Sequence, residues 1–248
     1  MNTSSKRVGN LVILLMGKKR VGKNTAAQVI RREIESKIEV SVGTDGKVSR
    51  GCLVQEFAFA DELRRHLSIM NPIVSLCGNY RWNDAIEKYG YETAKDKFPE
   101  MRRLMEIYGT EVVRNRVNEN YWANYVRSEV EKFNFESNSN GFDTVSLITD
   151  CRFLNEVRAF EYTRYKLGTI EILGILRGSV DDGGKHPSNA GLDALNDSHG
   201  YGLDISCIGT INNNGSINEF EERVKSAWKQ IRGGKDALDE AMLVKSPS

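Results

Sequence analysis

The sequence contains few cysteines and no closely spaced pair of them. Disulfide frameworks and zinc knuckles need paired cysteines at short, regular spacing, and no C-x-x-C pair occurs. Both kinds of framework are therefore disfavoured, and we expect buried, reduced thiols. The four cysteines lie far apart, at Cys52, Cys77, Cys151 and Cys207.

An excess of charge of one sign is also missing. The 35 Lys and Arg residues are balanced by 34 Asp and Glu residues, which leaves a formal net charge of +1. So small a net charge gives no long-range field that would attract nucleic acid or an anionic membrane. We expect neither as a partner, and any recognition of phosphate must be local.

No long hydrophobic run opens the chain. The first apolar run, Leu11–Met16, has six residues, which is too short for a transmembrane helix or a typical signal core. A short continuous apolar run is typical of a parallel strand that is covered on both faces. We therefore interpret it as a central strand, and we expect a cytoplasmic protein.

A glycine-bounded loop follows this run and carries the strongest functional signal. Its spacing, G-x-x-x-x-G-K between a strand and a helix, is typical of phosphate-binding loops. Glycine lets the backbone turn tightly and point its N–H groups inward, and the helix N-terminus adds positive potential. The loop and first helical turn comprise Gly17, Lys18, Lys19, Arg20, Val21, Gly22, Lys23, Asn24 and Thr25.

Within this loop, Lys23 can reach the terminal phosphates of a nucleotide. A tight turn that binds nothing is the alternative, but the apolar run and the basic cluster Lys18-Lys19-Arg20 favour phosphate binding. Asn24 departs from the pattern, because Ser or Thr normally ligates Mg²⁺ at this position. The metal could be held through water, by Thr25 or by the amide oxygen of Asn24.

Apolar runs alternate with amphipathic helical patterns along the rest of the chain. This alternation predicts an α/β fold with a mostly parallel sheet, right-handed crossovers and a ligand site at the carboxyl ends of the strands. A chain of 248 residues suits one large domain with insertions or two small ones. The predicted strands cover Leu11–Met16, Leu53–Phe59, Thr144–Thr149, Ile170–Leu176 and Leu203–Ile211.

We expect a single domain over residues 1–232. Alternating apolar residues around an Asp-Gly turn predict a hairpin insertion over residues 37–52. Residues 71–133 should form a helical region that binds an acceptor. Residues 178–202 are rich in Gly, Asp and Asn and suit a lid, and residues 233–248 should form a C-terminal tail.

Glycines and polar clusters set the predicted helix boundaries. The helix over Glu100–Tyr108 should break at Gly109, and the polar stretch Asn134–Asp143 should be a surface loop. A capping box at Ser216-Ile-Asn-Glu219 should open the last helix, which Gly233-Gly234 should end. The helices predicted between these points cover Tyr121–Phe133 and Phe153–Lys166.

Charged residues follow four of the predicted strands, so the fold should gather them at one edge of the sheet. Phosphoryl transfer needs cations around the moving group, a metal held by an acid, and two aligned substrates. Asp150 could organise a metal or orient a substrate; a structural pair with Arg152 that caps the next helix is the alternative. The strand-end residues are Lys23, Asp61, Arg64, Asp150, Arg152 and Arg177.

The remaining cations and histidines give weaker signals. Arg102 and Arg103 begin a helix, where adjacent arginines usually form a solvated face. The three histidines are not spaced as a metal site. We expect His66 on a helix surface and His186 in the lid.

Together, several stretches resemble the deoxynucleoside monophosphate kinases of large tailed bacteriophages, over most of residues 10–232. Taken one at a time, only the glycine loop is a specific motif. The order and spacing of all the stretches together are much more specific for this family. The stretches are Gly17–Thr25, Phe59–Arg64, Arg102–Thr110 with Tyr121-Trp122, Thr149–Glu156, and Leu176–Gly178 through His186–Leu192.

The resemblance implies a P-loop nucleoside monophosphate kinase-like fold with a five-stranded sheet, a lid and a hairpin insertion, commonly as a homodimer. It implies an ATP- and Mg²⁺-dependent transfer of the γ-phosphoryl group to a deoxynucleoside 5′-monophosphate. Lys23 would hold ATP, and Asp150, Arg152 and Arg177 would act around the transferred group. Asn24, Thr25 and Asp150 are the candidate metal ligands. The candidate substrate contacts are Asp61, Arg64, Arg102, Arg103, Gly109, Thr110, Trp122, Asp150, Arg152 and Glu156.

Departures from the family pattern concern the lid and the insertion. Asn189 stands where relatives tend to carry an acid, and the hairpin over residues 37–52 looks like an addition. Another small-molecule kinase of this fold, such as one that phosphorylates dephospho-coenzyme A, is an alternative function. A GTP-dependent switch is a second alternative, but the N-K-x-D signature that reads guanine is missing.

Overall fold

The computed structural model describes residues 9–36, 51–178 and 207–243. Residues 1–8, residues 37–50 of the predicted hairpin, and residues 179–202 of the predicted lid lie outside the described residues, as do Asn189 and His186. The chain divides into two compact units, one of residues Met1–Phe57 and Glu129–Ser248, the other of Ala58–Ser128. We describe each unit by itself.

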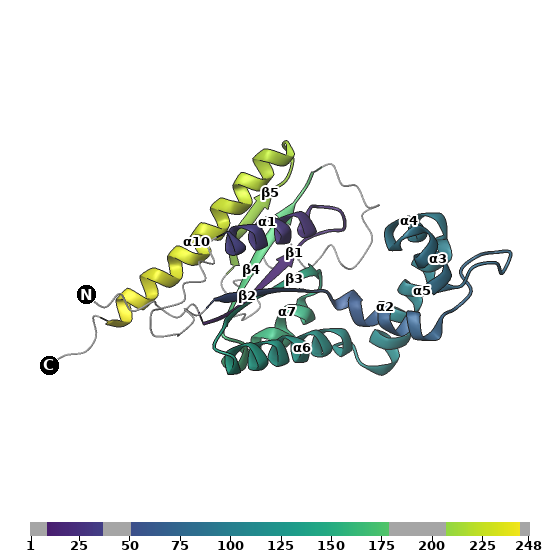
Figure 1. Cartoon of the computed structure of the whole chain (residues 1–248), viewed down its shortest axis with the longest axis horizontal. Helices are drawn as coiled ribbons and strands as arrows, with labels where there is room; N and C mark the ends of the chain where they lie inside the picture. Colours follow the sequence, from purple (N-terminus) through teal and green to yellow (C-terminus); the bar gives the residue numbers. More distant parts are fainter. Residues whose placement is uncertain (1–8, 37–50, 179–206, 244–248) are drawn as a thin grey trace. The chain divides into compact units, whose positions relative to one another are not determined.

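The first unit is built on a sheet of five strands in the order β2-β3-β1-β4-β5 (Figure 1). Every neighbouring pair is parallel, which confirms the predicted α/β fold. The strand bounds differ from the sequence prediction by a few residues. The strands are β1 (Asn10–Met16), β2 (Cys52–Phe57), β3 (Asp143–Cys151), β4 (Thr169–Leu176) and β5 (Cys207–Asn212).

The three central strands are apolar because helices cover both faces of the sheet. Leu11 of β1 pairs with Val145 of β3 on one side and with Thr169 of β4 on the other. The run Leu11–Met16 is buried along its whole length. A strand buried on both faces has no polar side, which explains why the sequence shows a continuous apolar run and no alternation.

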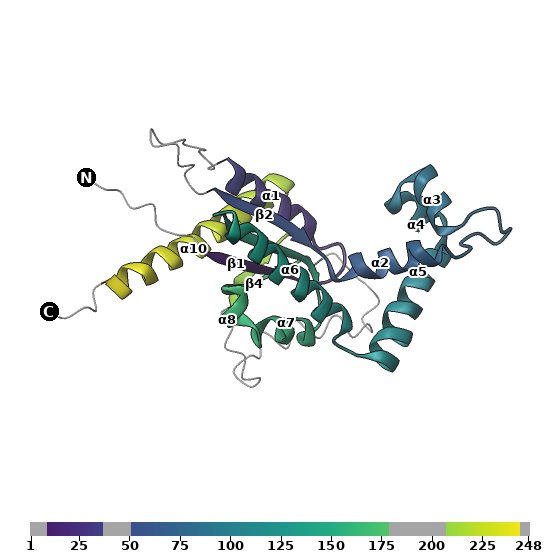
Figure 2. The ribbon, with the colours of Figure 1, turned by 60° about the horizontal axis from the view of Figure 1, so that its bottom comes forward.

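Helices α1 (Lys23–Glu35) and α10 (Ile217–Leu243) lie on one face of the sheet, and α7 (Leu154–Glu161) and α8 (Arg164–Leu167) lie on the other (Figures 1 and 2). The first face buries a single apolar cluster, in which Ile30 of α1 and Phe220 of α10 are fully covered. This packing fixes the loop between β1 and α1 against the sheet.

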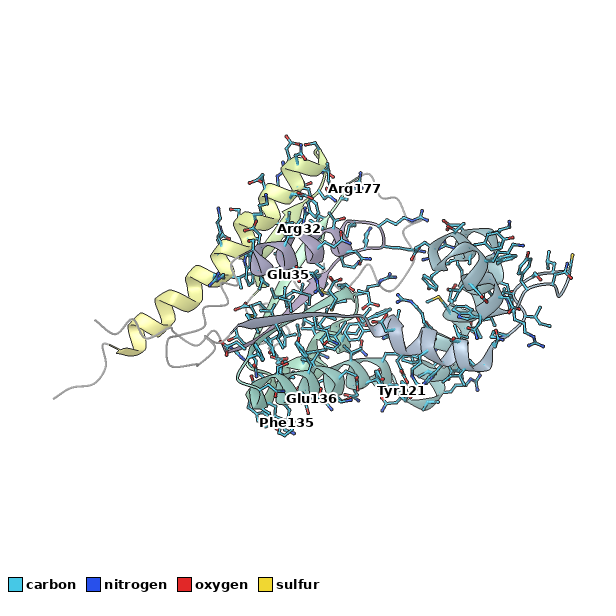
Figure 3. The ribbon with its side chains drawn as sticks, in the orientation of Figure 1. Arg32, Glu35, Tyr121, Phe135, Glu136 and Arg177 are labelled. Atoms are coloured by element: carbon cyan, nitrogen blue, oxygen red, sulfur yellow. The ribbon has the colours of Figure 1, made fainter. Side chains whose placement is uncertain are left out.

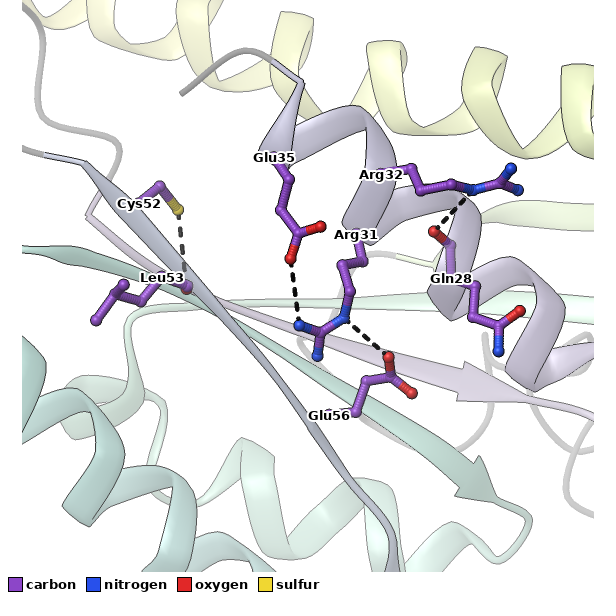
Figure 4. A network of polar contacts seen from close by, with 7 residues as sticks. All are labelled: Gln28, Arg31, Arg32, Glu35, Cys52, Leu53 and Glu56. Carbon is purple, nitrogen blue, oxygen red and sulfur yellow. Dashed lines mark hydrogen bonds and ion pairs between the residues drawn. The ribbon is translucent and has the colours of Figure 1, made fainter. Parts of the chain in front are cut away.

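Polar contacts hold α1 to its neighbours. The Arg31 guanidinium donates to Glu35 within the helix, with 3.4 Å between Nη1 and Oε1, and to Glu56 of β2, with 3.1 Å between Nε and Oε1 (Figure 4). On the other side, Arg32 Nη2 lies 2.8 Å from Glu221 Oε1 of α10. Because these ion pairs are partly exposed, they contribute little to the free energy of folding and mainly orient α1 against β2 and α10.

Helix α6 (Tyr121–Ser139) is longer than predicted, and the predicted surface loop at Asn134–Asp143 is largely wrong. Asn134 is 3 % exposed. Its Nδ2 donates to the Leu167 carbonyl at 3.3 Å, and its Oδ1 accepts a 2.6 Å hydrogen bond from the Thr144 hydroxyl. Polar composition suggested a loop because sequence cannot show that these polar groups have buried partners.

Two other helix predictions need correction. The helix predicted over Phe153–Lys166 is divided into α7 and α8, because the chain leaves the helix at Tyr162. The last helix, predicted to end at Gly233-Gly234, continues to Leu243. A glycine inside a helix costs only about 1 kcal/mol, and the helix formers that follow it outweigh that cost.

The capping box is confirmed: Ser216 Oγ accepts from the Glu219 amide at 3.3 Å, and the Ser216 amide donates to Glu219 Oε2 at 2.8 Å.

The second unit is helical, as predicted for this region. It contains α2 (Phe59–Met70), α3 (Trp82–Tyr89), α4 (Tyr91–Lys97), α5 (Pro99–Glu106), the π-helix η1 (Ile107–Val117) and the first residues of α6. Among the described residues, no helix is both long and apolar enough to cross a membrane.

The predicted break at Gly109 is wrong, because η1 continues directly from α5. The wider turn is visible at its end, where the Asn118 amide donates to the Val113 carbonyl, five residues back, at 2.9 Å. Gly109 is buried, and a Cβ added there would stand 2.9 Å from the Leu63 side chain. The glycine is therefore needed for close packing, not for ending a helix.

Candidate active site

The glycine loop joins the end of β1 to the start of α1, as the sequence predicts. Gly22 has a φ of 107°, in the region that favours glycine, and even Arg20 has a φ of 64°. A Cβ on Gly17 would stand 2.4 Å from the carbonyl oxygen of Ile175 in β4. Both glycines of the motif are therefore required by the backbone itself.

Asn213, just after β5, holds this loop and was missed by the sequence analysis. Its Nδ2 donates to the Val21 carbonyl at 2.8 Å in a buried contact. A Cβ on Gly22 would come within 2.6 Å of the same nitrogen. The backbone amide of Asn213 donates to the Leu176 carbonyl of β4 at 2.7 Å. No local pattern points to Asn213, since it lies 192 residues after Val21 in the sequence.

Lys23 folds back over the loop at the start of α1. Its Nζ donates to the carbonyl oxygens of Gly17 at 2.6 Å and Lys18 at 2.7 Å. The side chain is buried. Burial, together with the neighbouring positive charge of Arg152, lowers the pKa of Lys23 to about 8, although Asp150 and Glu156 oppose the shift. A largely desolvated ammonium at the loop is suited to bind an anion.

The pKa effects of Asp150, Arg152 and Glu156 place the end of β3 next to Lys23. Strand β3 is the direct neighbour of β1, and their last paired residues are Met16 and Cys151. Four sequence-predicted site residues therefore lie together in the first unit. An anion bound by Lys23 would also be attracted by the positive charge of Arg152.

Glu156 caps a helix. Its carboxylate Oε2 accepts from the amides of Arg152 at 2.8 Å and Phe153 at 3.0 Å, which caps the N-terminus of α7. The side chain is 2 % exposed. An Asp150–Arg152 pair is the alternative cap that the sequence suggests for this helix, but the carboxylate that accepts from the first amides is that of Glu156.

Oxygen ligands suitable for Mg²⁺ occur at the loop. Asn24 is exposed and Thr25 is half-buried in the first turn of α1, and Asp150 is half-buried at the end of β3. Mg²⁺ in nucleotide sites is held by one or two protein oxygens together with phosphates and water. A single carboxylate with a hydroxyl fits this pattern, whereas no cluster of three or more His, Cys, Asp or Glu side chains occurs among the described residues.

Arg177 follows β4 at the same edge of the sheet and is exposed (Figure 3). The next residue, Gly178, donates its amide to Asn214 Oδ1 at 2.7 Å. This contact ties the end of β4 to the segment after β5. The cation is therefore in place at the strand end that the sequence predicted.

The candidate acceptor residues at the start of α2 form an ion pair. Asp61 Oδ1 lies 2.5 Å from Arg64 Nη1, and Asp61 Oδ2 accepts from the Ala58 amide at 3.1 Å. The buried Nε of Arg64 has no hydrogen-bond partner in the part of the chain that the structure describes. The Arg64 guanidinium lies over the ring of Tyr91, 5.0 Å from its centroid.

The arginines of α5 differ from each other. Arg102 pairs with Asp96, and its side chain is 32 % exposed. Arg103 is 61 % exposed and donates through Nε and Nη2 to both oxygens of Glu100, at 2.7 and 2.6 Å. Arg103 therefore fits the solvated face that adjacent arginines usually form, and Arg102 is the better candidate ligand.

The structure brings Gly109 and Trp122 together. The indole Nε1 of Trp122 donates to the Gly109 carbonyl at 3.0 Å, in a buried contact between α6 and η1. Thr110, the next residue of η1, is exposed. The backbone around a candidate acceptor pocket is thus fixed by an aromatic side chain.

His66 was expected on a helix surface, and this expectation is wrong. Its side chain is 20 % exposed, and its Nε2 lies 2.8 Å from Oε1 of the buried Glu62. Its Nδ1 lies 3.0 Å from the Tyr108 hydroxyl, and its ring packs 5.7 Å from that of Trp122. Glu62 also binds Arg65 with two short hydrogen bonds, which lower the pKa of Glu62. Sequence offered one signal, an i,i+4 Glu–His pair, but not its buried surroundings.

The parallel sheet and the lysine-bearing glycine loop define an α/β protein of the P-loop nucleotide-binding kind. The family model for deoxynucleotide monophosphate kinase matches residues 64–224, and the chain belongs to this family. The protein is accordingly an ATP-dependent phosphotransferase that acts on nucleotides.

Among solved structures, the dephospho-CoA kinase from Campylobacter jejuni aligns with 92% of this chain and 99% of its own, with 12% identity and a TM-score of 0.41. No curated protein matches the sequence.

Proposed function

We propose that the protein transfers the γ-phosphoryl group of ATP to deoxynucleoside 5′-monophosphates and so forms the diphosphates. The observation that supports this most strongly is the buried Lys23 ammonium, held over a glycine loop in a chain of this family. A desolvated cation interacts with phosphate more strongly than one in water.

In the proposed reaction, a phosphate oxygen of the acceptor attacks the γ-phosphorus of ATP. The bond between this phosphorus and the oxygen that bridges to the β-phosphate breaks, and ADP leaves. Lys23 and the loop amides bind the phosphates of ATP, and Arg152 and Arg177 balance charge on the moving group. Lys23 is held by backbone carbonyls before ATP binds, so little reorganisation is needed.

Mg²⁺, when bound, would neutralise charge between the β- and γ-phosphates. Asp150 and Thr25 are the residues that would hold it, with the amide oxygen of Asn24 as an additional ligand. Asp150 also offsets the positive charge of Arg152 beside Lys23. It thereby raises the pKa of Lys23 and favours the charged ammonium.

The acceptor is proposed to bind to the second unit. Arg64 and Arg102 would hold its phosphate, with Asp61 orienting Arg64. Gly109, Thr110 and Trp122 would line the pocket for the nucleoside, and the Trp122–Gly109 hydrogen bond would keep its shape. Of the predicted substrate contacts, Arg103 has the weakest support, because Glu100 occupies its guanidinium.

The wider setting follows from this activity. We propose that the catalytic domain spans residues 1–232, with an insertion at 37–52, an acceptor-binding region at 71–133, a lid at 178–202 and a tail from residue 233. We further propose that the protein works in the cytoplasm as a homodimer and supplies deoxynucleotides for DNA synthesis, as the resemblance to bacteriophage enzymes implies.

A substrate panel tests the proposal. Purified full-length protein is incubated with ATP and Mg²⁺ and with each of the four deoxy- and four ribonucleoside monophosphates, and ADP release is measured. We expect turnover of at least one deoxynucleotide. Turnover of dephospho-coenzyme A alone would point to the alternative small-molecule kinase, and no turnover of any deoxynucleotide would refute the proposal.

A further inference from the structure

Two cations lie over one aromatic ring in the second unit, and the charge of a third acts on the same side chain. Arg64 of α2 lies with its guanidinium carbon 5.0 Å from the centroid of the Tyr91 ring. The ammonium nitrogen of Lys95, in α4, lies 4.9 Å from the same centroid. The charge of Arg102, in α5, also acts on the Tyr91 hydroxyl. Three separate helices therefore bring positive charge to one side chain.

Tyr91 is held in place from α5. Its hydroxyl donates to the thioether sulfur of Met105 at 3.0 Å, and the side chain is half-buried. Burial raises the pKa of the Tyr91 hydroxyl, so the phenol stays neutral and does not neutralise the neighbouring cations. A neutral ring attracts cations through its face without cancelling their charge.

Each of these cations is paired with a carboxylate that is more exposed than the cation itself. Lys95 is 15 % exposed, whereas its partner Glu92 is 77 % exposed. Arg64 and Asp61 are 38 % and 56 % exposed, and Arg102 and Asp96 show the same order. Exposed carboxylates are weak competitors because water screens them. A phosphate dianion can therefore displace Glu92 from Lys95 and Asp96 from Arg102, and it can bind Arg64 while Asp61 stays on Nη1.

The buried Nε–H of Arg64 adds a second observation. This donor has no hydrogen-bond partner among the residues that the structure describes. A buried donor without a partner is rare and indicates a missing acceptor. A phosphate oxygen is such an acceptor, and guanidinium binds phosphate through two parallel donors.

We propose that Tyr91 and Lys95 complete the acceptor-phosphate site: Lys95 binds the phosphate of the nucleoside monophosphate together with Arg64, and Tyr91 holds both cations. This inference rests on the proposed function. Lys95 is a direct ligand of the substrate, and Tyr91 is a positioning residue. Neither residue belongs to a stretch that carries the family resemblance, and each is brought to Arg64 by the fold.

The chain offers a matched control for Lys95. The ammonium nitrogen of Lys97, on the same helix, lies 4.1 Å from the centroid of the Tyr89 ring, so Lys97 makes a lysine-on-tyrosine contact with a different ring. Lys95→Gln should raise the KM for the deoxynucleotide about tenfold or more, because a charge-assisted hydrogen bond is lost. The KM for ATP should stay within about twofold, and Lys97→Gln should leave both values unchanged.

Two variants of Tyr91 separate the contribution of its ring from that of its hydroxyl. Tyr91→Phe keeps the ring and should retain a near-normal KM for the deoxynucleotide, whereas Tyr91→Leu should raise it as Lys95→Gln does. Thermal melting identifies any variant that fails to fold. If Tyr91→Leu does not fold, the Lys95 variants decide the matter, and Lys95→Arg should restore most of the lost affinity.

Calorimetric titration with inorganic phosphate separates failure of this inference from failure of the proposed function. If the wild-type protein phosphorylates no deoxynucleotide, the proposed function fails, but weaker phosphate binding by Lys95→Gln than by Lys97→Gln would still support the site. If the wild-type protein is active and Lys95→Gln matches Lys97→Gln in both KM and phosphate affinity, the inference is overturned.

Discussion

Replacing Lys23 by Met should remove activity and at the same time stabilise the protein. Burial lowers the pKa of Lys23 from 10.5 to about 8. Each pKa unit corresponds to about 1.36 kcal/mol, so the folded state at neutral pH carries a penalty on the order of 3 kcal/mol for the charged side chain. A methionine of similar length avoids this penalty.

Part of the gain is offset, since the carbonyls of Gly17 and Lys18 lose a charged donor. A carbonyl left without its partner costs about 1 kcal/mol when water can reach it. We therefore expect Lys23→Met to unfold with a free energy about 1 to 2 kcal/mol higher than that of the wild type. Turnover should fall by at least about a thousandfold, as befits the loss of a group that binds the transferred phosphates.

The pH dependence gives a sharper test of the same reasoning. The pKa of Lys23 in the folded protein lies below that in the unfolded chain, so the unfolded state holds more protons between pH 8 and 10.5. Wild-type stability should therefore rise relative to the variant across this window, while the full penalty is present below pH 8.

Urea unfolding without nucleotide, at several pH values, measures this difference. Lys132→Met, at an exposed position of α6, is the control and should change the free energy of unfolding by less than about 0.5 kcal/mol. A Lys23→Met protein that is less stable than the wild type at pH 7, with a pH-independent difference, would refute the burial argument.

The remaining predictions concern the loop and one arginine. Asn213→Ala removes the 2.8 Å bond to Val21, and the KM for ATP should rise several-fold, with stability lower by about 1 to 2 kcal/mol; unchanged ATP kinetics would show that Asn213 does not shape the loop. Gly22→Ala places a Cβ 2.6 Å from Asn213 Nδ2 at a φ of 107°, so ATP binding measured by calorimetry should be lost, and tight binding would contradict the proposed loop geometry. Arg103→Gln should alter the KM for the deoxynucleotide less than twofold, whereas Arg102→Gln should raise it at least about tenfold; equal effects in steady-state kinetics would remove this distinction.

Local signals in the sequence were sufficient for the sheet and the glycine loop. The apolar run Leu11–Met16 needs only its own composition to indicate a central strand, and Gly17 and Gly22 mark a loop by their spacing. The gathering of Lys23 and Arg152 followed from a general rule, that parallel strands end at one edge. These features depend on short stretches of chain, which is why sequence reasoning found them.

What sequence reasoning missed depends on contacts between distant residues. Asn134 and Asn213 resemble loop residues in composition, yet both are buried. Asn134 has a hydrogen-bond partner in β3, and Asn213 has one in the glycine loop. The sequence predicts an exposed His66, because no residue near it in the chain indicates the contact with Tyr108. The sequence predicts a helix end at Gly109, although the role of this glycine is to let the Leu63 side chain pack closely. In each case a partner far along the chain decides the role of the residue.

Transfer of labelled phosphate tests the central claim most directly. The protein is incubated with ATP labelled in the γ-phosphoryl group, Mg²⁺ and a deoxynucleoside monophosphate, and the products are separated by anion-exchange chromatography. We predict that the label appears in the deoxynucleoside diphosphate with wild-type protein and that Lys23→Met gives none above background. Label found only in inorganic phosphate, or equal transfer by Lys23→Met, would contradict the account.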